Sequence, residues 1–168
     1  MDWADHARGS VPGWPVALFR IAFGILYIDM ALQKAPWKNF GWLEGFIKQE
    51  IAHPAFGVVA TVLRDVVLPN LALFGTLTFV VELALGIALV TGLLTRLAAA
   101  AGFLWQVNIA MQAFNVPGEW YWIWPLLTLP QFTFAACGAG RVFGVDAWLR
   151  QRLAGARIGW ARLALALT

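Results

Sequence analysis

The sequence predicts an all-α membrane protein whose main part is a four-transmembrane-helix bundle. Hydrophobic residues make up 61% of the 168 residues and charged residues only 12%, whereas a soluble domain carries about 25% charged residues. Four apolar runs reach the length of about 17–25 residues that a hydrocarbon core requires. We expect the spans at about 15–33, 71–94, 97–115 and 120–138.

The ends of the predicted spans carry residues that begin or end helices. Pro15 suits the first turn of the first span. The stretch from Gly92 to Arg96 marks a tight turn between the second and third spans, and Asn115-Val-Pro-Gly118 marks another between the third and fourth. Gly138 is expected to end the fourth span. The amino-terminal segment begins with acidic rather than basic residues, so we expect the first span to be retained and not cleaved as a signal peptide.

The stretch 34–70 is too long for a hairpin turn and mixes charged with aromatic residues. Within it, residues 55–68 are apolar but too short to cross a bilayer, which predicts an interfacial or re-entrant helix. We therefore expect an interfacial cap between the first and second spans. With this cap, the predicted transmembrane domain covers residues 1–146.

Residues 147–168 predict a basic amphipathic surface helix. Leucines, alanine and Trp160 recur at three- and four-residue steps, while Arg150, Arg157 and Arg162 lie off that face. Such a helix suits an anionic membrane surface. A helix docked on a partner subunit explains the pattern equally well.

The distribution of basic residues predicts the orientation, because cytoplasmic loops are enriched in Lys and Arg. Four spans place both termini on one side together with the turn at Thr95–Arg96. That side holds seven basic residues against four on the side of the cap. We therefore expect a multi-pass protein of the inner (plasma) membrane with both termini cytoplasmic and the cap extracytoplasmic.

The scarcity of cysteine and histidine limits the chemistry of the chain itself. One cysteine, Cys137, excludes an internal disulfide, a Cys-x-x-Cys pair and a thiolate metal site, and we expect it to be an inert buried thiol. His6 and His53 lie outside the apolar runs, so two intramembrane histidines cannot hold a haem. We therefore expect no metal or haem.

Glu82 lies near the middle of the second apolar run. A carboxylate at the bilayer centre costs several kcal/mol, so Glu82 is expected to face the bundle interior and to be paired or protonated. Arg20 in the first span is the partner that we expect, since two long side chains can bridge a depth difference of roughly 9 Å. Such a pair could equally serve only to lock two helices together.

The third span adds Asn108 and Gln112, four residues apart on one face, with Trp105 beside them. Gln106 is expected to point elsewhere. These amides could be interhelical hydrogen-bond partners. The functional alternative is a pocket below the cap, in which a charged pair and amides orient a polar head group such as a quinone carbonyl, or relay a proton.

Three stretches of the sequence resemble a known family. The first span reads FRIAFGILYIDMALQKAPW and the second VELALGIALVTGLLTRLAA, which resemble the motifs of the DoxX family. AGRVFGVDAWL after the fourth span, and EWYW before it, resemble the DoxD type, the small subunit of thiosulfate:quinone oxidoreductase. The resemblance covers roughly residues 15–150. Besides Arg20, Lys34 and Glu82, its pattern includes Gly24, Gly86, Arg96, Arg141 and Asp146.

The resemblance implies a membrane bundle associated with quinone-linked redox complexes, although family members differ in function. Together with the polar residues described above, it leads to the hypothesis of a small subunit of a quinone-linked oxidoreductase, in which Glu82 and Arg20 form the catalytic pair. Lys34, Asn108, Gln112 and Trp105 would bind a quinone or another polar head group. Electrons would have to be carried by that quinone or by a partner's cofactor.

Two other functions remain open from the sequence. One is a non-catalytic scaffold subunit of a larger respiratory or photosynthetic complex. The other is a small transporter or lipid-handling protein, for which no inverted repeat is evident. The expected partners are membrane lipids and other protein subunits, not nucleic acid.

Overall fold

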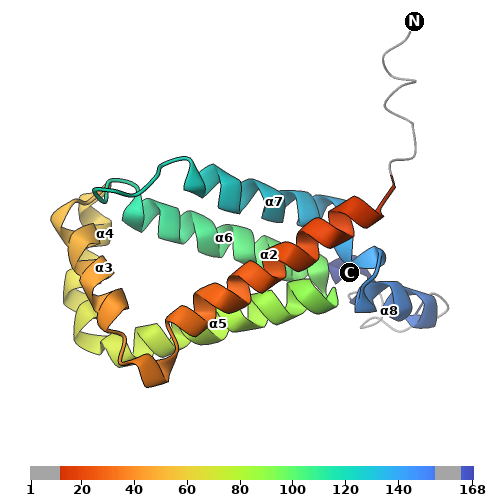
Figure 1. Cartoon of the computed structure of the whole chain (residues 1–168), viewed down its shortest axis with the longest axis horizontal. Helices are drawn as coiled ribbons and strands as arrows, with labels where there is room; N and C mark the ends of the chain where they lie inside the picture. Colours follow the sequence, from red (N-terminus) through yellow and green to blue (C-terminus); the bar gives the residue numbers. More distant parts are fainter. Residues whose placement is uncertain (1–11, 154–163) are drawn as a thin grey trace, which may run out of the picture.

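The computed structural model describes residues 12–153 and 164–168, and its regular elements are all helical (Figure 1). The longer helices are α2 (Trp14–Gln33), α3 (Gly41–Ala52), α4 (Gly57–Val62), α5 (Leu71–Thr91), α6 (Thr95–Ala113), α7 (Ile123–Cys137) and α8 (Val145–Leu153). Short helical turns connect some of them: η1 (Pro36–Lys38), η2 (Leu63–Val67), η3 (Leu68–Asn70) and η4 (Ala139–Arg141).

Within the described residues, two helical segments are long and apolar enough to cross a membrane, Trp14–Gln33 and Gly57–Thr91. The second has 35 residues because α4, η2, η3 and α5 follow one another without a break. Helix α7 is apolar but has only 15 residues, since it begins at Ile123 rather than near 120. That α6 and α7 also cross the membrane stays a prediction.

The cap consists of α3 and the first part of the Gly57–Thr91 segment, which run across one end of the bundle (Figure 1). The chain then turns into α5, which runs along the length of the molecule. The turn lies at a π-helical stretch, Leu63–Val67, and at Pro69. Both disturb the regular helical hydrogen-bond ladder and so permit a bend.

Glycines bring α2 and α5 into close contact along their length. A Cβ on Gly86 would lie 2.7 Å from the Ile28 side chain and 2.9 Å from the Gly24 carbonyl oxygen. A Cβ on Gly24 would lie 2.7 Å from the Val90 backbone nitrogen. The absence of side chains at both positions lets the two backbones meet, and this contact sets the register between the helices.

The turns at the opposite end of the bundle lie where the sequence predicts them. Gly92 and Gly138 end α5 and α7 with φ of +67° and +59°, a conformation that favours glycine. Asp146 fixes the first of these turns from α8. Its two carboxylate oxygens accept hydrogen bonds from the backbone N–H groups of Leu94 and Thr95 at 2.7 and 2.8 Å, which satisfies donors at the start of α6.

The carboxyl-terminal part of the structure bears on the expectations for Cys137 and for the amphipathic segment. Cys137 is exposed at the end of α7, so the expectation of a buried thiol is wrong. Helix α8 carries Arg150 and Arg152 in its last turn. Residues 154–163 of the predicted amphipathic segment, including Arg157 and Arg162, lie outside the described residues.

Candidate functional site

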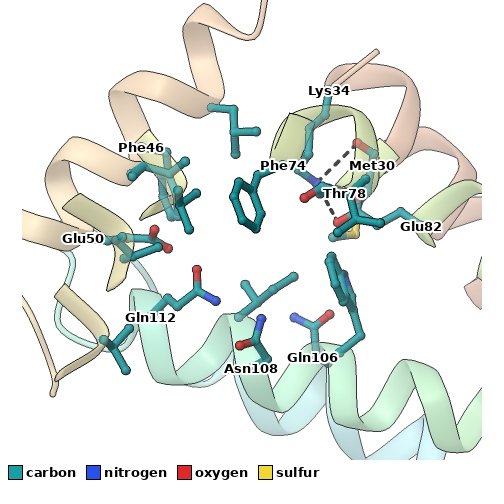
Figure 2. A pocket seen from close by; sticks show the side chains of 18 of the residues that line it. Met30, Lys34, Phe46, Glu50, Phe74, Thr78, Glu82, Gln106, Asn108 and Gln112 are labelled. Atoms are coloured by element: carbon teal, nitrogen blue, oxygen red, sulfur yellow. Dashed lines mark hydrogen bonds and ion pairs between the residues drawn. The ribbon is translucent and has the colours of Figure 1, made fainter. Parts of the chain in front are cut away.

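A cavity of about 590 Å³ lies between the cap and the helices α5, α6 and α7. Its volume falls within the range of about 300–1,000 Å³ that is usual for small-molecule sites. Apolar and aromatic side chains form most of the wall, and a few polar groups project into it from different helices (Figure 2). The mixture suits a ligand with an apolar body and a polar head.

An ion pair between Lys34 and Glu82 lies at this cavity (Figure 2). Lys34 Nζ is 2.9 Å from Glu82 Oε1 and 2.8 Å from Oε2. The side chain of Glu82 has no exposed surface, and that of Lys34 is 10% exposed. The Lys34 ammonium also lies 5.9 Å from the centre of the Trp42 ring on α3, within the range of a cation–π contact. Glu82 therefore faces inward and is paired, as expected, but with a different cation.

The expected pair of Arg20 with Glu82 is wrong. Arg20 is fully buried near the start of α2, where its Nη2 donates to the Phe143 carbonyl oxygen at 3.0 Å. The glycine contact explains this, because it places Arg20 beside Gly92, whereas Glu82 lies level with residues near the end of α2. About ten residues of helical rise, or about 15 Å, separate these two levels.

Three side chains of α6 that the sequence singles out line the cavity, namely Trp105, Asn108 and Gln112. Gln106 also lines it, so the expectation that Gln106 points elsewhere is wrong. Its side-chain oxygen accepts a hydrogen bond from the Tyr27 hydroxyl at 3.3 Å.

Tyr27 and Gln131 extend this polar contact across the bundle core. Gln131 on α7 donates to the Tyr27 hydroxyl, and both side chains are fully buried. The sequence does not single out Tyr27, because an aromatic residue in an apolar run is usually part of the packing.

Two buried N–H groups of the cavity wall have no hydrogen-bond partner among the described residues: Gln106 Nε2 and Trp124 Nε1. The indole N–H of Trp105, in the same wall, faces the Glu82 carboxylate. Buried polar groups in native proteins are almost always hydrogen-bonded. Because both unpartnered groups are donors and lie in the same wall as a lysine, the cavity suits a ligand whose head presents hydrogen-bond acceptors.

Glu50 on α3 is a second buried carboxyl group at the cavity, and the sequence reasoning missed it. It is only 3% exposed. Burial, together with the nearby Glu119, raises the pKa of Glu50 to about 7. The signal lay in the helical spacing, since Glu50 shares a face with Phe46 and Ile47. The many exposed charges around it in the cap concealed that signal.

The other residues of the sequence pattern lie away from the cavity. Gly24 and Gly86 form the contact between α2 and α5, and Asp146 holds the turn before α6. Arg96 Nη2 donates to the Ala136 carbonyl oxygen at 3.4 Å. Burial lowers the pKa of Arg141, and so do the nearby charges of Arg150 and Arg96. Asp146, Arg96 and Arg141 organise the end of the bundle opposite the cap.

Comparison with known protein families gives a match over most of the chain. A family model described as "TQO small subunit DoxD" matches residues 16–165, a range that includes all of α2 except its first two residues, the helices from α3 to α8 and every residue of the cavity wall named above. Neither the curated proteins nor the solved structures compared with this chain give a match.

Proposed function

The chain belongs to the DoxD family, and from this premise we propose that it is the small integral-membrane subunit of a quinone-linked oxidoreductase resembling thiosulfate:quinone oxidoreductase. The family description names a small subunit, which supports association with further protein subunits. The apolar helices support a place in the membrane. Four spans, cytoplasmic termini and an extracytoplasmic cap in the inner membrane are part of the proposal.

The observation that carries the proposal is the Lys34–Glu82 pair at an apolar cavity with unpartnered N–H groups. A quinone presents two carbonyl oxygens, which only accept hydrogen bonds, on an apolar ring and tail. The unpartnered N–H groups of Gln106 and Trp124 suit such oxygens, and the aromatic and aliphatic wall suits the ring. The side chains present therefore fit a quinone head group.

A bound quinone would supply the capacity to accept two electrons. The ammonium of Lys34 would stabilise negative charge that develops on the nearer ring oxygen, because a fixed cation in a water-poor site acts strongly on such charge. Glu82 holds this ammonium in place with two short contacts. Asn108 and Gln112 orient the rest of the ring. Arg20, which is at the other end of α2, has a structural role instead.

The proposal is tested by extracting the protein gently from native membranes and measuring quinone in an organic extract, with mass spectrometry of copurifying subunits. We expect stoichiometric quinone and a cofactor-bearing partner, which would supply the electrons. Lys34→Met should lower the bound quinone at least tenfold, and Lys48→Met, which changes an exposed lysine of the cap, should leave it unchanged. Undiminished quinone in Lys34→Met, or no quinone in the native complex, would contradict the proposal.

A groove between α5 and α6 favours a second candidate function, that of a non-catalytic scaffold subunit. The groove has a volume of about 330 Å³ and is lined by leucines, Val81 and the small residues Ala84, Ala88, Ala98 and Ala101. Small residues allow close approach of another membrane helix. Under this alternative, Ala88→Phe lowers the yield of assembled complex, and changes at Lys34 alter neither quinone content nor turnover.

A further inference from the structure

The cap end of the cavity carries a carboxyl group that the proposed function does not yet use. Glu50 points from α3 into the same space as Glu82 (Figure 2). The amides of Gln112, Asn108 and Gln106 lie along the α6 side between the two carboxyl groups (Figure 2). A cavity of about 590 Å³ has room for several water molecules beside these amides, since water occupies about 30 Å³ each.

No cation of the described residues neutralises Glu50. Among the residues that the structure describes, the charged groups in the cavity wall besides Glu50 are Glu119, Lys34 and Glu82. Glu119, in the loop before α7, has the same charge sign as Glu50, and Lys34 is held by Glu82.

The other charges of the cap turn away from the cavity. Glu44 pairs with Lys48 at 2.6 Å on the exposed side of α3, and Arg64 lies 3.6 Å from Asp65 on the neighbouring segment, where both are exposed. His53, at the end of α3, is exposed and does not line the cavity. A buried carboxyl group that has no cation beside it, but does have a like-charged neighbour, holds its proton more tightly than an exposed carboxyl group does.

We propose that Glu50 is a proton-exchanging group that connects the cap surface to the cavity and delivers protons to the ligand head beside Lys34 and Glu82. The delivery step rests on the proposed quinone function. Conversion of a quinone to a quinol takes two electrons, here from a redox cofactor of a partner subunit, and two protons. For each proton, the O–H bond of Glu50 breaks, water molecules held along the amide-lined wall carry the proton, and a new O–H bond forms at a ring oxygen. Glu50 then regains a proton from the aqueous side through the region of Glu119.

Proton exchange at Glu50 is tested without any activity measurement by labelling the purified full-length protein with dicyclohexylcarbodiimide. This apolar reagent modifies protonated carboxyl groups in apolar surroundings, and peptide mass spectrometry locates the product. We expect Glu50 to be labelled at pH 6 and labelling to fall at least tenfold at pH 9, while Glu44 on the exposed face of the same helix stays unlabelled. Glu119→Gln, which removes the like charge, should shift the midpoint of labelling to lower pH. Absent labelling at pH 6, or labelling that does not depend on pH, overturns the proposal.

Proton delivery is tested with Glu50→Gln and the matched control Glu44→Gln in the intact complex. Gln keeps the size of Glu50 but cannot release a proton. We expect Glu50→Gln to lower kcat for quinone reduction at least tenfold and to abolish the part of its pH dependence that follows the labelling midpoint, with Glu44→Gln unchanged. Unchanged kcat and pH profile in Glu50→Gln overturn delivery by Glu50. If the unaltered complex does not reduce quinone, the proposed function is refuted, and proton delivery to a quinone is refuted with it. The labelling experiment still decides whether Glu50 exchanges protons.

Discussion

Lys34 connects three helices at the cavity through the contacts of its charged side chain. It follows α2, its ammonium contacts both carboxylate oxygens of Glu82 on α5, and it lies over Trp42 on α3. Removal of one member of a buried ion pair leaves an uncompensated charge, which costs about 3–5 kcal/mol. The pair therefore joins the cap to the bundle as well as shaping the site.

Lys34→Met is expected to lower the free energy of unfolding by about 3 kcal/mol, measured by denaturant unfolding in detergent. The double variant Lys34→Met/Glu82→Gln should regain most of this loss, because no buried charge is left without a partner. Lys48→Met breaks only an exposed pair on α3 and should cost no more than about 0.5 kcal/mol. Equal losses for Lys34→Met and the double variant would show that the charge pairing is not what stabilises this site.

Glu50 makes stability depend on pH. Burial and the nearby Glu119 raise the pKa of its carboxyl group from the ordinary value of 4.5 to about 7. Between these values the folded chain keeps a proton that the unfolded chain has lost, so stability falls as pH rises through this window. The stabilisation of the folded state by this proton is complete below pH 4.5 and is lost above about pH 7.

We therefore expect the denaturant concentration at the midpoint of unfolding to decrease for the unaltered protein when the pH is raised from 5 to 8. For Glu50→Gln this decrease should be much smaller. The comparison uses denaturant unfolding in detergent at several pH values. Glu44→Gln, at an exposed position of α3, serves as the control and should follow the unaltered protein. A fall of the same size in Glu50→Gln would assign the pH dependence to another group.

At the scale of elements, the contact between α2 and α5 depends on two positions without side chains. The Cβ of an alanine at Gly86 would lie 2.9 Å from a backbone oxygen of α2, which cannot be avoided by a side-chain rotation. The helices would have to separate, and the register that places Glu82 near Lys34 would be lost with their contact.

Gly86→Ala is accordingly expected to destabilise the protein by about 1–3 kcal/mol, the usual cost of overpacking, although alanine favours a helix more than glycine does. Gly45→Ala in α3 is the matched control, since a Cβ there meets nothing within 4 Å, and it should be neutral or stabilising by up to about 1 kcal/mol. Thermal unfolding followed by size-exclusion chromatography measures both. A neutral Gly86→Ala would contradict the close contact.

The individual elements were more predictable than their pairing. Apolar length, Gly92 and Gly138 located α2, α5 and the ends of α5 and α7 to within a few residues, because these signals are local. The partner of Glu82 depends on the register between two helices, which the contact of Gly24 with Gly86 sets. Nothing local to Arg20 or Lys34 contains that information.

The site was predictable only in part for the same reason. A carboxylate in an apolar run must turn inward, so Glu82 was found, and the helical spacing of Asn108 and Gln112 correctly indicated one face. Glu50 lies in a segment rich in surface charge, where one buried carboxyl group does not stand out. Tyr27 resembles any aromatic residue of the core until Gln106 and Gln131 are known to contact it.

At the scale of the whole molecule, the cap and the turns held by Asp146 lie at opposite ends of the bundle (Figure 1). If the bundle crosses the membrane with its termini in the cytoplasm, these ends lie in different compartments. Among the described residues, the two ends carry equal numbers of basic residues that are at least partly exposed: Arg96, Arg141, Arg150 and Arg152 at the end opposite the cap, and Lys34, Lys38, Lys48 and Arg64 at the cap end. The orientation therefore stays a prediction.

Single cysteines introduced into a Cys137→Ser background test this orientation. We expect Lys48→Cys in the cap to react with a membrane-impermeant maleimide in intact cells. Gln151→Cys on the exposed side of α8 should react only after the membrane is opened. The opposite result would reverse the orientation, and labelling of both in intact cells would mean that the ends share one side.

Residues 57–91 form one continuous helical segment that bends at Leu63–Val67 and Pro69, so the roof of the cavity passes directly into the helix that bears Glu82. A partner that pressed on the cap would therefore tilt the carboxylate below it. Entry of a ligand into the cavity and the position of the Lys34–Glu82 pair would then be coupled through this one helical segment.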